Sequence, residues 1–153
     1  MKKYFIIILS ITLLAVVIFL GQKFYQNQTD EQARKMLAAS GMNFYDDSID
    51  KALQKAAKEK KNLMLYFYAS WCGVCQKMKK EVFSNARIHT FYNTNFVNMA
   101  LNIEKEGKTL SEKYDVDSFP AMIFINENGK IIQKIVGFKS VDEFLGMGKK
   151  IVQ

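Results

Sequence analysis

The sequence has 153 residues, of which 49% are hydrophobic and 24% are charged, and its formal net charge is +7. This composition is ordinary for a folded protein and argues against a disordered chain. The basic residues are spread along the chain and are not clustered with stacking aromatic residues, so we predict no nucleic-acid binding. After an apolar N-terminal segment, roughly 125 residues remain, which is enough for one packed domain.

The first predicted element is this apolar segment, which carries no charge from Tyr4 to Gln22. As a helix that rises about 1.5 Å per residue it would span about 28 Å, close to the roughly 30 Å hydrocarbon core of a bilayer. A cleavable signal peptide is the competing interpretation. It needs small residues before the cleavage site, and only Gly21 is small there. We therefore predict a signal anchor within residues 1–27.

Charges on either side of the segment predict its orientation. Lys2 and Lys3 precede it, whereas only Lys23 follows closely. The positive-inside rule then places the N-terminus in the cytoplasm and the rest of the chain across the membrane. The predicted location is a bacterial inner membrane, crossed once through residues 4–22, with the domain facing the periplasm. If the segment is cleaved, the protein is secreted into the periplasm.

The next elements are two predicted helices. Residues 28–47 form a predicted linker, in which the capping-box spacing at Thr29-Asp30-Glu31-Gln32 predicts a short helix from Thr29 to about Ala39. Ser48 is the predicted N-cap of a second helix that runs through Lys60. Its apolar face, predicted to pack in the core, consists of Ile49, Ala52, Leu53 and Ala56. The folded domain is predicted to span 48–153.

A strand and a helix are predicted on either side of the stretch WCGVC at residues 71–75. The apolar run from Leu63 to Ala69 has the length of a buried central strand. After the stretch, Val74, Met78 and Val82 recur at helical spacing. The charged residues of that helix are placed mostly on its other faces, namely Lys77, Lys79, Lys80 and Glu81. Cys72 and Cys75 thus lie where a strand turns into a helix.

These are the only two cysteines in the chain, and three uses compete for them. A structural disulfide that closes so short a loop removes little chain entropy. A structural zinc site needs four ligands, and besides the cysteines the chain offers only His89, which we predict to be exposed and inert. We therefore favour a reactive dithiol, with no metal and no cofactor beyond the cysteines themselves.

The predicted helix start assigns the two cysteines their roles. Cys72 faces unpaired backbone N–H groups and the positive end of the helix dipole, which favour thiolate over thiol. Cys75 follows three residues later on the same face. Cys72 is therefore the predicted nucleophile that forms a mixed disulfide with a substrate. Cys75 is the resolving cysteine, which attacks Cys72 and releases the reduced substrate.

From about Ser48 to Val152 the sequence resembles the thioredoxin superfamily. WCGVC resembles its W-C-G-x-C motif. The stretch LNIEKEGKTLSEKYDVDSFPAMIFINENGKIIQKIVGF resembles its strand, helix, cis-proline strand and terminal hairpin, and SVDEFLGMGKKIV resembles its closing helix. KKEVFSNARIHTFYNTNFV is more similar to the membrane-linked and exported branch. The resemblance implies an α/β, thioredoxin-like fold, a central mixed sheet flanked by helices, here preceded by a transmembrane helix.

The resemblance also implies a substrate-binding surface. Pro120 is the only proline, and it opens a predicted strand, AMIFIN. The family implies a cis Phe119-Pro120 bond beside the cysteines, with backbone that can pair with a substrate strand. The implied substrate-binding residues are Trp71, Gly73, Val74, Phe119 and Pro120.

The sequence departs from the family pattern near the cysteines. Tyr66 stands where the family usually has a buried acid, and Ala100 stands where a lysine commonly accompanies that acid. Cys75 must then lose its proton to water or to another group, for which Glu104 is a candidate. Ala121 follows the proline where thioredoxin commonly has threonine, so substrate preference cannot be carried over.

We therefore predict a membrane-anchored thiol-disulfide oxidoreductase. A reductase is favoured, with disulfides of exported proteins or of apocytochromes as substrates and an upstream membrane thiol protein as electron donor. The Gly-Val pair between the cysteines fits neither the reducing nor the oxidising members of the family, so an oxidase or isomerase is an alternative. A non-catalytic, anchored binding module is the other alternative.

Overall fold

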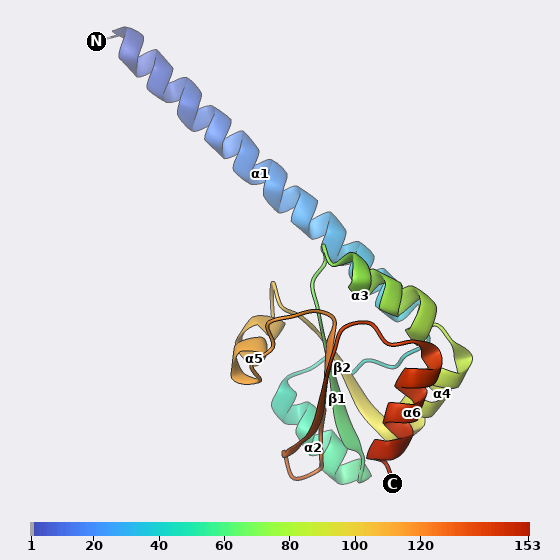
Figure 1. Ribbon diagram of the computed structural model, residues 1–153. Coiled ribbons are helices and arrows are strands. Elements are labelled where there is room, and N and C mark those ends of the chain that lie inside the picture. Colours follow the sequence, from blue (N-terminus) through green and yellow to red (C-terminus); the bar gives the residue numbers. More distant parts are fainter. Residues whose placement is uncertain (1) are drawn as a thin grey trace. The chain divides into compact units, whose positions relative to one another are not determined.

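The computed structural model describes residues 2–153 (Figure 1). The chain divides into two compact units, Met1–Gln32 and Ala33–Gln153, which we describe separately. Helix α1, Lys2–Ala38, supplies the described residues of the first unit and continues into the second. Its segment Ile7–Ala38 is long and apolar enough to cross a membrane, a test that a signal sequence also passes.

The prediction of a separate helix that opens at Thr29 is wrong. Helix α1 continues through this residue, and the Thr29 hydroxyl donates a hydrogen bond to the Gln26 carbonyl oxygen at 2.9 Å. A hydroxyl used in this way sits inside a helix and does not cap the start of one. Between Gln22 and Thr29 no glycine or proline interrupts the chain, so helix formation continues from the apolar segment.

The second unit is built on a four-stranded sheet with the strand order β2-β1-β3-β4. The strands are β1 Asn62–Tyr68, β2 Phe96–Asn102, β3 Ala121–Ile125 and β4 Ile131–Val136. Strand β1 pairs parallel with β2 and antiparallel with β3, and β3 pairs antiparallel with β4. This mixed sheet confirms the α/β prediction. Strand β1 is the predicted central strand, and all of its residues after Asn62 are buried.

Helices cover both faces of the sheet, as Figure 1 shows. They are α2 Ile49–Glu59, α3 Gly73–Lys77, the π-helix η1 Met78–Phe83, α4 Ala86–Asn95, α5 Gly107–Lys113 and α6 Val141–Ile151. The predicted cap of α2 is confirmed, because the Ser48 side chain accepts a hydrogen bond from the Lys51 N–H. The predicted closing helix is α6, which begins with a capping box between Ser140 and Glu143.

Alternate residues of β1 enter two separate cores, because successive side chains of a strand point to opposite faces. The first, which we call the aromatic core, includes Tyr66, Tyr68, Phe83, Tyr92, Phe124 and Phe144. The second, which we call the aliphatic core, includes Ala52, Ala56, Leu63, Leu65, Phe67, Val97 and Ile123. Ala52 and Ala56 confirm the predicted buried face of α2. Ala33 and Leu37 at the end of α1 are also buried in the aromatic core.

His89 is half-buried, so the prediction that it is exposed is wrong. Its ring lies against Gly41, where an added Cβ would come within 2.8 Å of His89 Cδ2. Gly41 has a φ of +80°, so the chain makes a left-handed turn there that glycine adopts without strain. Histidine packed in this way contributes to the contact between α4 and the segment that follows α1.

Candidate active site

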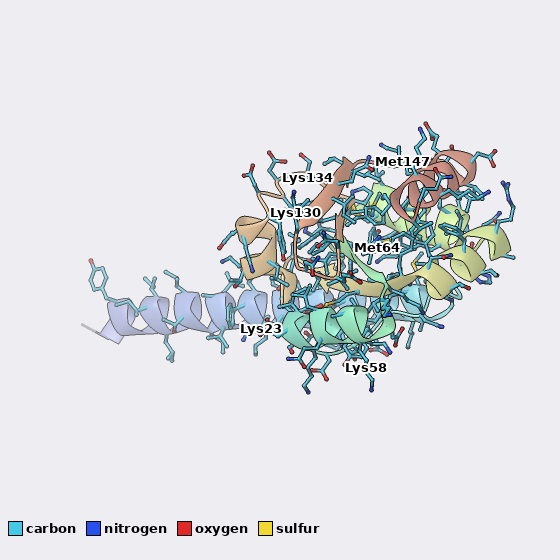
Figure 2. All side chains as sticks on the ribbon, turned by 90° about the horizontal axis from the view of Figure 1, so that it is seen from below. Lys23, Lys58, Met64, Lys130, Lys134 and Met147 are labelled. Carbon is cyan, nitrogen blue, oxygen red and sulfur yellow. A yellow bond between two sulfur atoms is a disulfide. The ribbon has the colours of Figure 1, made fainter. Side chains whose placement is uncertain are left out.

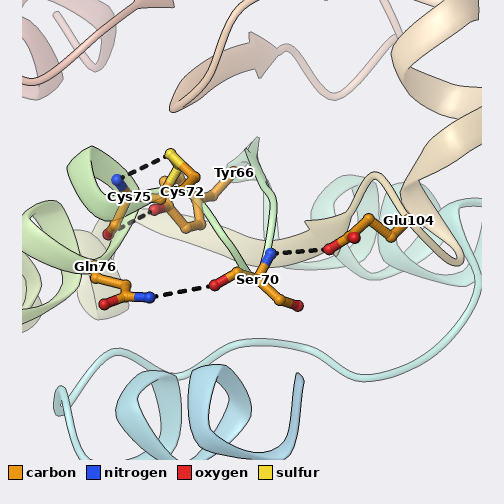
Figure 3. The surroundings of a disulfide bond; sticks show 6 residues. All are labelled: Tyr66, Ser70, Cys72, Cys75, Gln76 and Glu104. Atoms are coloured by element: carbon orange, nitrogen blue, oxygen red, sulfur yellow. Dashed lines mark hydrogen bonds between the residues drawn. A yellow bond between two sulfur atoms is a disulfide. The ribbon is translucent and has the colours of Figure 1, made fainter. Parts of the chain in front are cut away.

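Cys72 and Cys75 form a disulfide between β1 and α3 (Figure 3). Cys72 is the N-cap residue of α3, and its Sγ accepts a hydrogen bond from the Cys75 backbone N–H at 3.1 Å. Cys75 is fully buried, whereas Cys72 is 7% exposed. The predicted position of Cys72 at a helix start is therefore confirmed. The N–H group that meets its sulfur is a donor that would favour a thiolate in the reduced protein.

The surface around the disulfide is apolar and open to solvent. Trp71 is 67% exposed and Val74 is 49% exposed. Gly73 is also exposed, and a Cβ added there would meet nothing within 4 Å. Of the three residues that recur at helical spacing, Met78 and Val82 are buried beside Cys75, whereas Val74 is exposed. Val74 and Trp71 are thus two exposed apolar side chains within the WCGVC stretch.

The Phe119-Pro120 peptide bond is cis, as the resemblance implied. Ala121, the next residue, pairs with Phe67 near the C-terminal end of β1. The bond therefore lies beside the C-terminal end of β1, from which the chain leads to the cysteines. Phe119 is half-buried and packs against the same cluster that contains both cysteines. The structure thus brings together the cysteine turn and the proline segment.

Tyr66 lies beneath the disulfide. Its side chain is fully buried, and its hydroxyl donates a hydrogen bond to the Cys75 carbonyl oxygen at 3.2 Å. Burial raises the pKa of Tyr66 well above its ordinary value. Ala100 is its partner across β1 and β2. A neutral phenol and a methyl group therefore occupy this pair of positions, and neither can accept a proton from Cys75 at neutral pH.

Glu104 is hydrogen-bonded to Ser70 and not to a cysteine. Its Oε2 accepts from the Ser70 backbone N–H at 3.0 Å, and Figure 3 shows it reaching Ser70 from the side away from the disulfide. The Gln76 side chain donates to the Ser70 carbonyl oxygen at 3.2 Å, and Asn102 Nδ2 donates to Ser70 Oγ at 3.0 Å. These bonds hold the turn that leads into Trp71. Sequence reasoning missed this group, although a buried Asn102 at the end of an apolar strand was a usable signal.

Lys79 is buried, so the prediction that it lies on an outer face of the helix is wrong. It is 1% exposed, and its Nζ lies 3.8 Å from the centre of the Tyr68 ring. Lys58 and Lys130, in contrast, are exposed, and Figure 2 shows Lys58 pointing outward from the domain. The helix changes to the π-helix η1 at Met78, and a π-helix turns less per residue than an α-helix. The faces assigned from α-helical spacing therefore shift after this point.

The site can exchange electrons through its own sulfur atoms. A disulfide accepts two electrons when a thiolate attacks one of its sulfurs and a mixed disulfide is then resolved. Within residues 2–153, the side chains described contain no group of three His, Cys, Asp or Glu residues placed to hold a metal ion. The chemistry that the described groups offer is therefore thiol-disulfide exchange at Cys72 and Cys75.

Comparisons with known proteins agree with this chemistry. A family model of the thioredoxin-like domain matches residues 49–151. Thioredoxin-1 of Drosophila melanogaster is 32% identical over 108 residues, which cover 71% of this chain and 88% of that protein. The solution structure of a putative disulphide-isomerase from Bacteroides thetaiotaomicron has a TM-score of 0.64 and 33% identity, and the match covers 71% of this chain and 90% of that one.

A further relative is a larger protein. The thiol:disulfide interchange protein DsbD of Campylobacter jejuni (strain RM1221) is 35% identical over 104 residues, which cover 66% of this chain and 18% of that protein. The likeness is therefore confined to one part of that relative. The family match, the fold and the disulfide at the start of α3 together show that this chain belongs to the thioredoxin-like family and is a thiol-disulfide oxidoreductase.

Proposed function

We propose that this protein is a membrane-anchored reductase of disulfides in exported proteins. The observation that carries the proposal is the Cys72-Cys75 disulfide, which sits at a helix start beside the exposed apolar side chains of Trp71 and Val74. A disulfide whose neighbouring apolar side chains are exposed suits a protein substrate that is extended or incompletely folded. Such a substrate offers apolar side chains to cover that surface.

In the proposed reaction Cys72 acts first. Its thiolate attacks one sulfur of the substrate disulfide, the substrate S–S bond breaks, and the leaving sulfur departs as a thiolate that takes up a proton. Cys75 then loses its proton and attacks Cys72 Sγ. The mixed disulfide breaks, and the second substrate sulfur leaves as a thiol. The substrate has gained two electrons, and the protein ends with the Cys72-Cys75 disulfide seen in the structure.

The base that deprotonates Cys75 in this proposal is water. Tyr66 is a neutral phenol beneath the site, and the carboxylate of Glu104 is hydrogen-bonded to Ser70. Substrate contacts are assigned to Trp71, Gly73, Val74, Phe119 and Pro120. The residues around the cis peptide bond precede β3 and offer backbone groups with which an extended substrate strand can pair.

A thiol donor must reduce the Cys72-Cys75 disulfide again after each reaction, and we propose that both proteins are held in a membrane. Residues 1–27 would anchor the chain, and the apolar composition of α1 supports this role. Lys2 and Lys3, compared with Lys23, support a domain on the periplasmic side of an inner membrane. The electron donor would be a thiol protein in that membrane. The likeness to part of a thiol:disulfide interchange protein supports such an exchange partner.

The same sulfur chemistry run in the other direction would make an oxidase or an isomerase. The likeness to a putative disulphide-isomerase supports that second candidate. The reduction potential of the dithiol separates the two directions. A donor is expected near roughly −270 mV and an oxidant near roughly −120 mV.

Insulin reduction tests the proposed function. The parent protein should accelerate the precipitation of insulin in dithiothreitol, whereas Cys72→Ser should fall to the uncatalysed rate. Cys75→Ser is the matched variant, and it should accumulate a mixed disulfide on Cys72 because the resolving thiol is gone. A Cys72→Ser variant as active as the parent would contradict the proposal and favour a binding module in which the cysteines only stabilise the site.

A further inference from the structure

Lys79 is a buried cation on the helical run that carries the disulfide. Lysine is seldom fully buried unless its ammonium group is stabilised, because a charge loses its hydration inside a protein. Here the ammonium lies over the face of Tyr68, whose ring attracts a cation through its quadrupole. An uncharged amine would gain nothing from this electrostatic attraction. The ring contact therefore favours the charged form of Lys79.

Lys79 lies on the same helical run as Cys75, and both side chains are buried. Lys79 follows Cys75 by four residues, and residues at this spacing are neighbours on a helix surface, with Cβ atoms about 5–6 Å apart. Helical side chains lean toward the N-terminus of their helix, which here is the end that carries the disulfide. Tyr68, beneath the ammonium, stacks on Tyr66 with ring centres 5.7 Å apart, and Tyr66 bonds to the Cys75 carbonyl oxygen. Lys79 thus packs against Tyr68, which stacks on the tyrosine that is hydrogen-bonded to Cys75.

Other charged groups on the helical run of Lys79 and around Tyr68 are exposed. On the same helical run, Lys77 and Glu81 pair at 3.9 Å, and Lys80 is exposed. After β2, Glu104 is exposed and bound to Ser70. The cavity of about 450 Å³ beside Tyr68 is lined by the exposed charged residues Arg34, Asp46 and Glu106. Asp30, in the first unit, is the other charged residue among those described that is buried. Water and salt weaken the fields of exposed charges much more than the field of a buried one.

We propose that Lys79 is a positioning residue that stabilises the thiolate of the reduced Cys72-Cys75 pair and so shifts the thiol-disulfide equilibrium toward the reduced form. The proposal rests on the proposed redox function and deepens it. Reduction adds two electrons to the disulfide and leaves one thiolate and, after uptake of a proton, one thiol. Only the reduced state carries a negative charge, so a nearby cation stabilises that state alone and makes the protein a weaker electron donor than it would otherwise be.

The test compares Lys79→Met with Lys80→Met in the full-length protein. Both variants lose one positive charge, but Lys79 is buried and Lys80 is exposed. The redox equilibrium of each is measured against glutathione. Lys79→Met should favour the oxidised form about tenfold more than the parent, which corresponds to a potential about 30 mV more negative. Alkylation of Cys72 near pH 6 should slow to a similar degree, because less thiolate is present.

The redox equilibrium constant of Lys80→Met should stay within about twofold of the parent value. That of Lys79→Arg, which keeps the charge, should stay within about threefold. If Lys79→Met does not fold, Lys79→Gln is measured in its place. An unchanged equilibrium in the neutral variant, or an equal shift in Lys80→Met, would overturn the proposal. Insulin reduction by the parent separates the two claims. An inactive parent refutes the proposed function. An active parent whose equilibrium with glutathione is unchanged by Lys79→Met refutes only the role of Lys79.

Discussion

The two faces of the sheet differ in what their cores contain. The aliphatic core consists of apolar side chains such as Leu65 and Ile123, whose packing needs only the right size and shape. The aromatic core contains tyrosines with hydroxyl groups that bond to backbone carbonyls, Tyr66 to Cys75 and Tyr92 to Phe144. Strand β1 contributes side chains to both cores. The comparison shows how one strand can provide a scaffold with one set of alternate residues and support the redox site with the other.

This difference has a consequence for mutations. A change in the aliphatic core should alter the free energy of unfolding and leave the chemistry of the cysteines unchanged. A change at Tyr66 or Lys79, on the aromatic side, should alter both, because Tyr66 bonds to Cys75 and Lys79 contacts Tyr68, which stacks on Tyr66.

Leu65→Ala should lower the free energy of unfolding without moving the reduction potential. Leu65 is fully buried in the aliphatic core, and its truncation leaves a cavity that costs about 2–5 kcal/mol. Denaturant unfolding of the oxidised protein and equilibration with glutathione would measure the two quantities. A clear shift of the potential in this variant would show that the two cores are not separate in function.

Tyr66→Asp should speed resolution near pH 7 while it destabilises the fold. A buried carboxylate could accept the Cys75 proton, but an unpaired one costs at least a few kcal/mol of stability. Adding Ala100→Lys should recover part of that loss, because Ala100 is the cross-strand partner of Tyr66. Stopped-flow decay of a preformed Cys72 mixed disulfide measures resolution. The parent should resolve faster as pH rises toward the ordinary thiol pKa of about 8.5. A parent rate that is fast and independent of pH between about 6 and 8 would point to another base.

Tyr66→Phe should cost about 1 kcal/mol at neutral pH, because it removes the hydrogen bond to Cys75. Its effect should change sign with rising pH. Burial raises the Tyr66 pKa in the folded protein above the value of about 10 expected in the unfolded chain. The neutral phenol therefore contributes its full stability below about pH 10, and that stability is lost as pH rises from there toward the folded pKa.

Denaturant titrations at a series of pH values would check this. The parent should lose stability above about pH 10 more steeply than Tyr66→Phe. Tyr92→Phe is the matched control in the same core, since burial also raises the pKa of Tyr92. It should flatten the alkaline loss in the same way and leave the resolution rate of the mixed disulfide unchanged. Equal slopes in the parent and both variants would contradict the burial argument.

Glu104→Gln should have the smallest effect. The amide oxygen can still accept from the Ser70 N–H, so the turn before Trp71 should hold its place. Resolution of the mixed disulfide should stay within about twofold of the parent rate if Glu104 is not the base. A large loss of rate near pH 7 would instead assign the proton transfer to this carboxylate.

Local signals in the sequence predicted most of the fold. The buried run before Trp71 predicted β1, the cap at Ser48 predicted the start of α2, and the apolar surround of Pro120 placed a strand after it. Each of these depends on one short stretch and on rules for strands or caps. The cysteine positions and the replacement of the acid by Tyr66 were also visible, because they lie within or near one motif.

The errors came from features that no short stretch contains. The π-helix at Met78 rotates the buried face of the helical run, so Lys79 is buried although α-helical spacing placed it outside. Thr29 has a good cap sequence, but the preceding residues continue the helix and override the cap. His89 is covered by Gly41, which lies far away in the sequence. The hydrogen bonds around Ser70 likewise join residues that only the fold brings together.

The most direct test of the account is which cysteine reacts first. The structure places Cys72 at the helix start, with the Cys75 N–H on its sulfur, and buries Cys75 completely. The reduced protein would be treated briefly with iodoacetamide at neutral pH and digested, and the label on each cysteine would be measured by mass spectrometry. We expect the label to lie predominantly on Cys72. Predominant labelling of Cys75 would contradict the proposed roles of both residues.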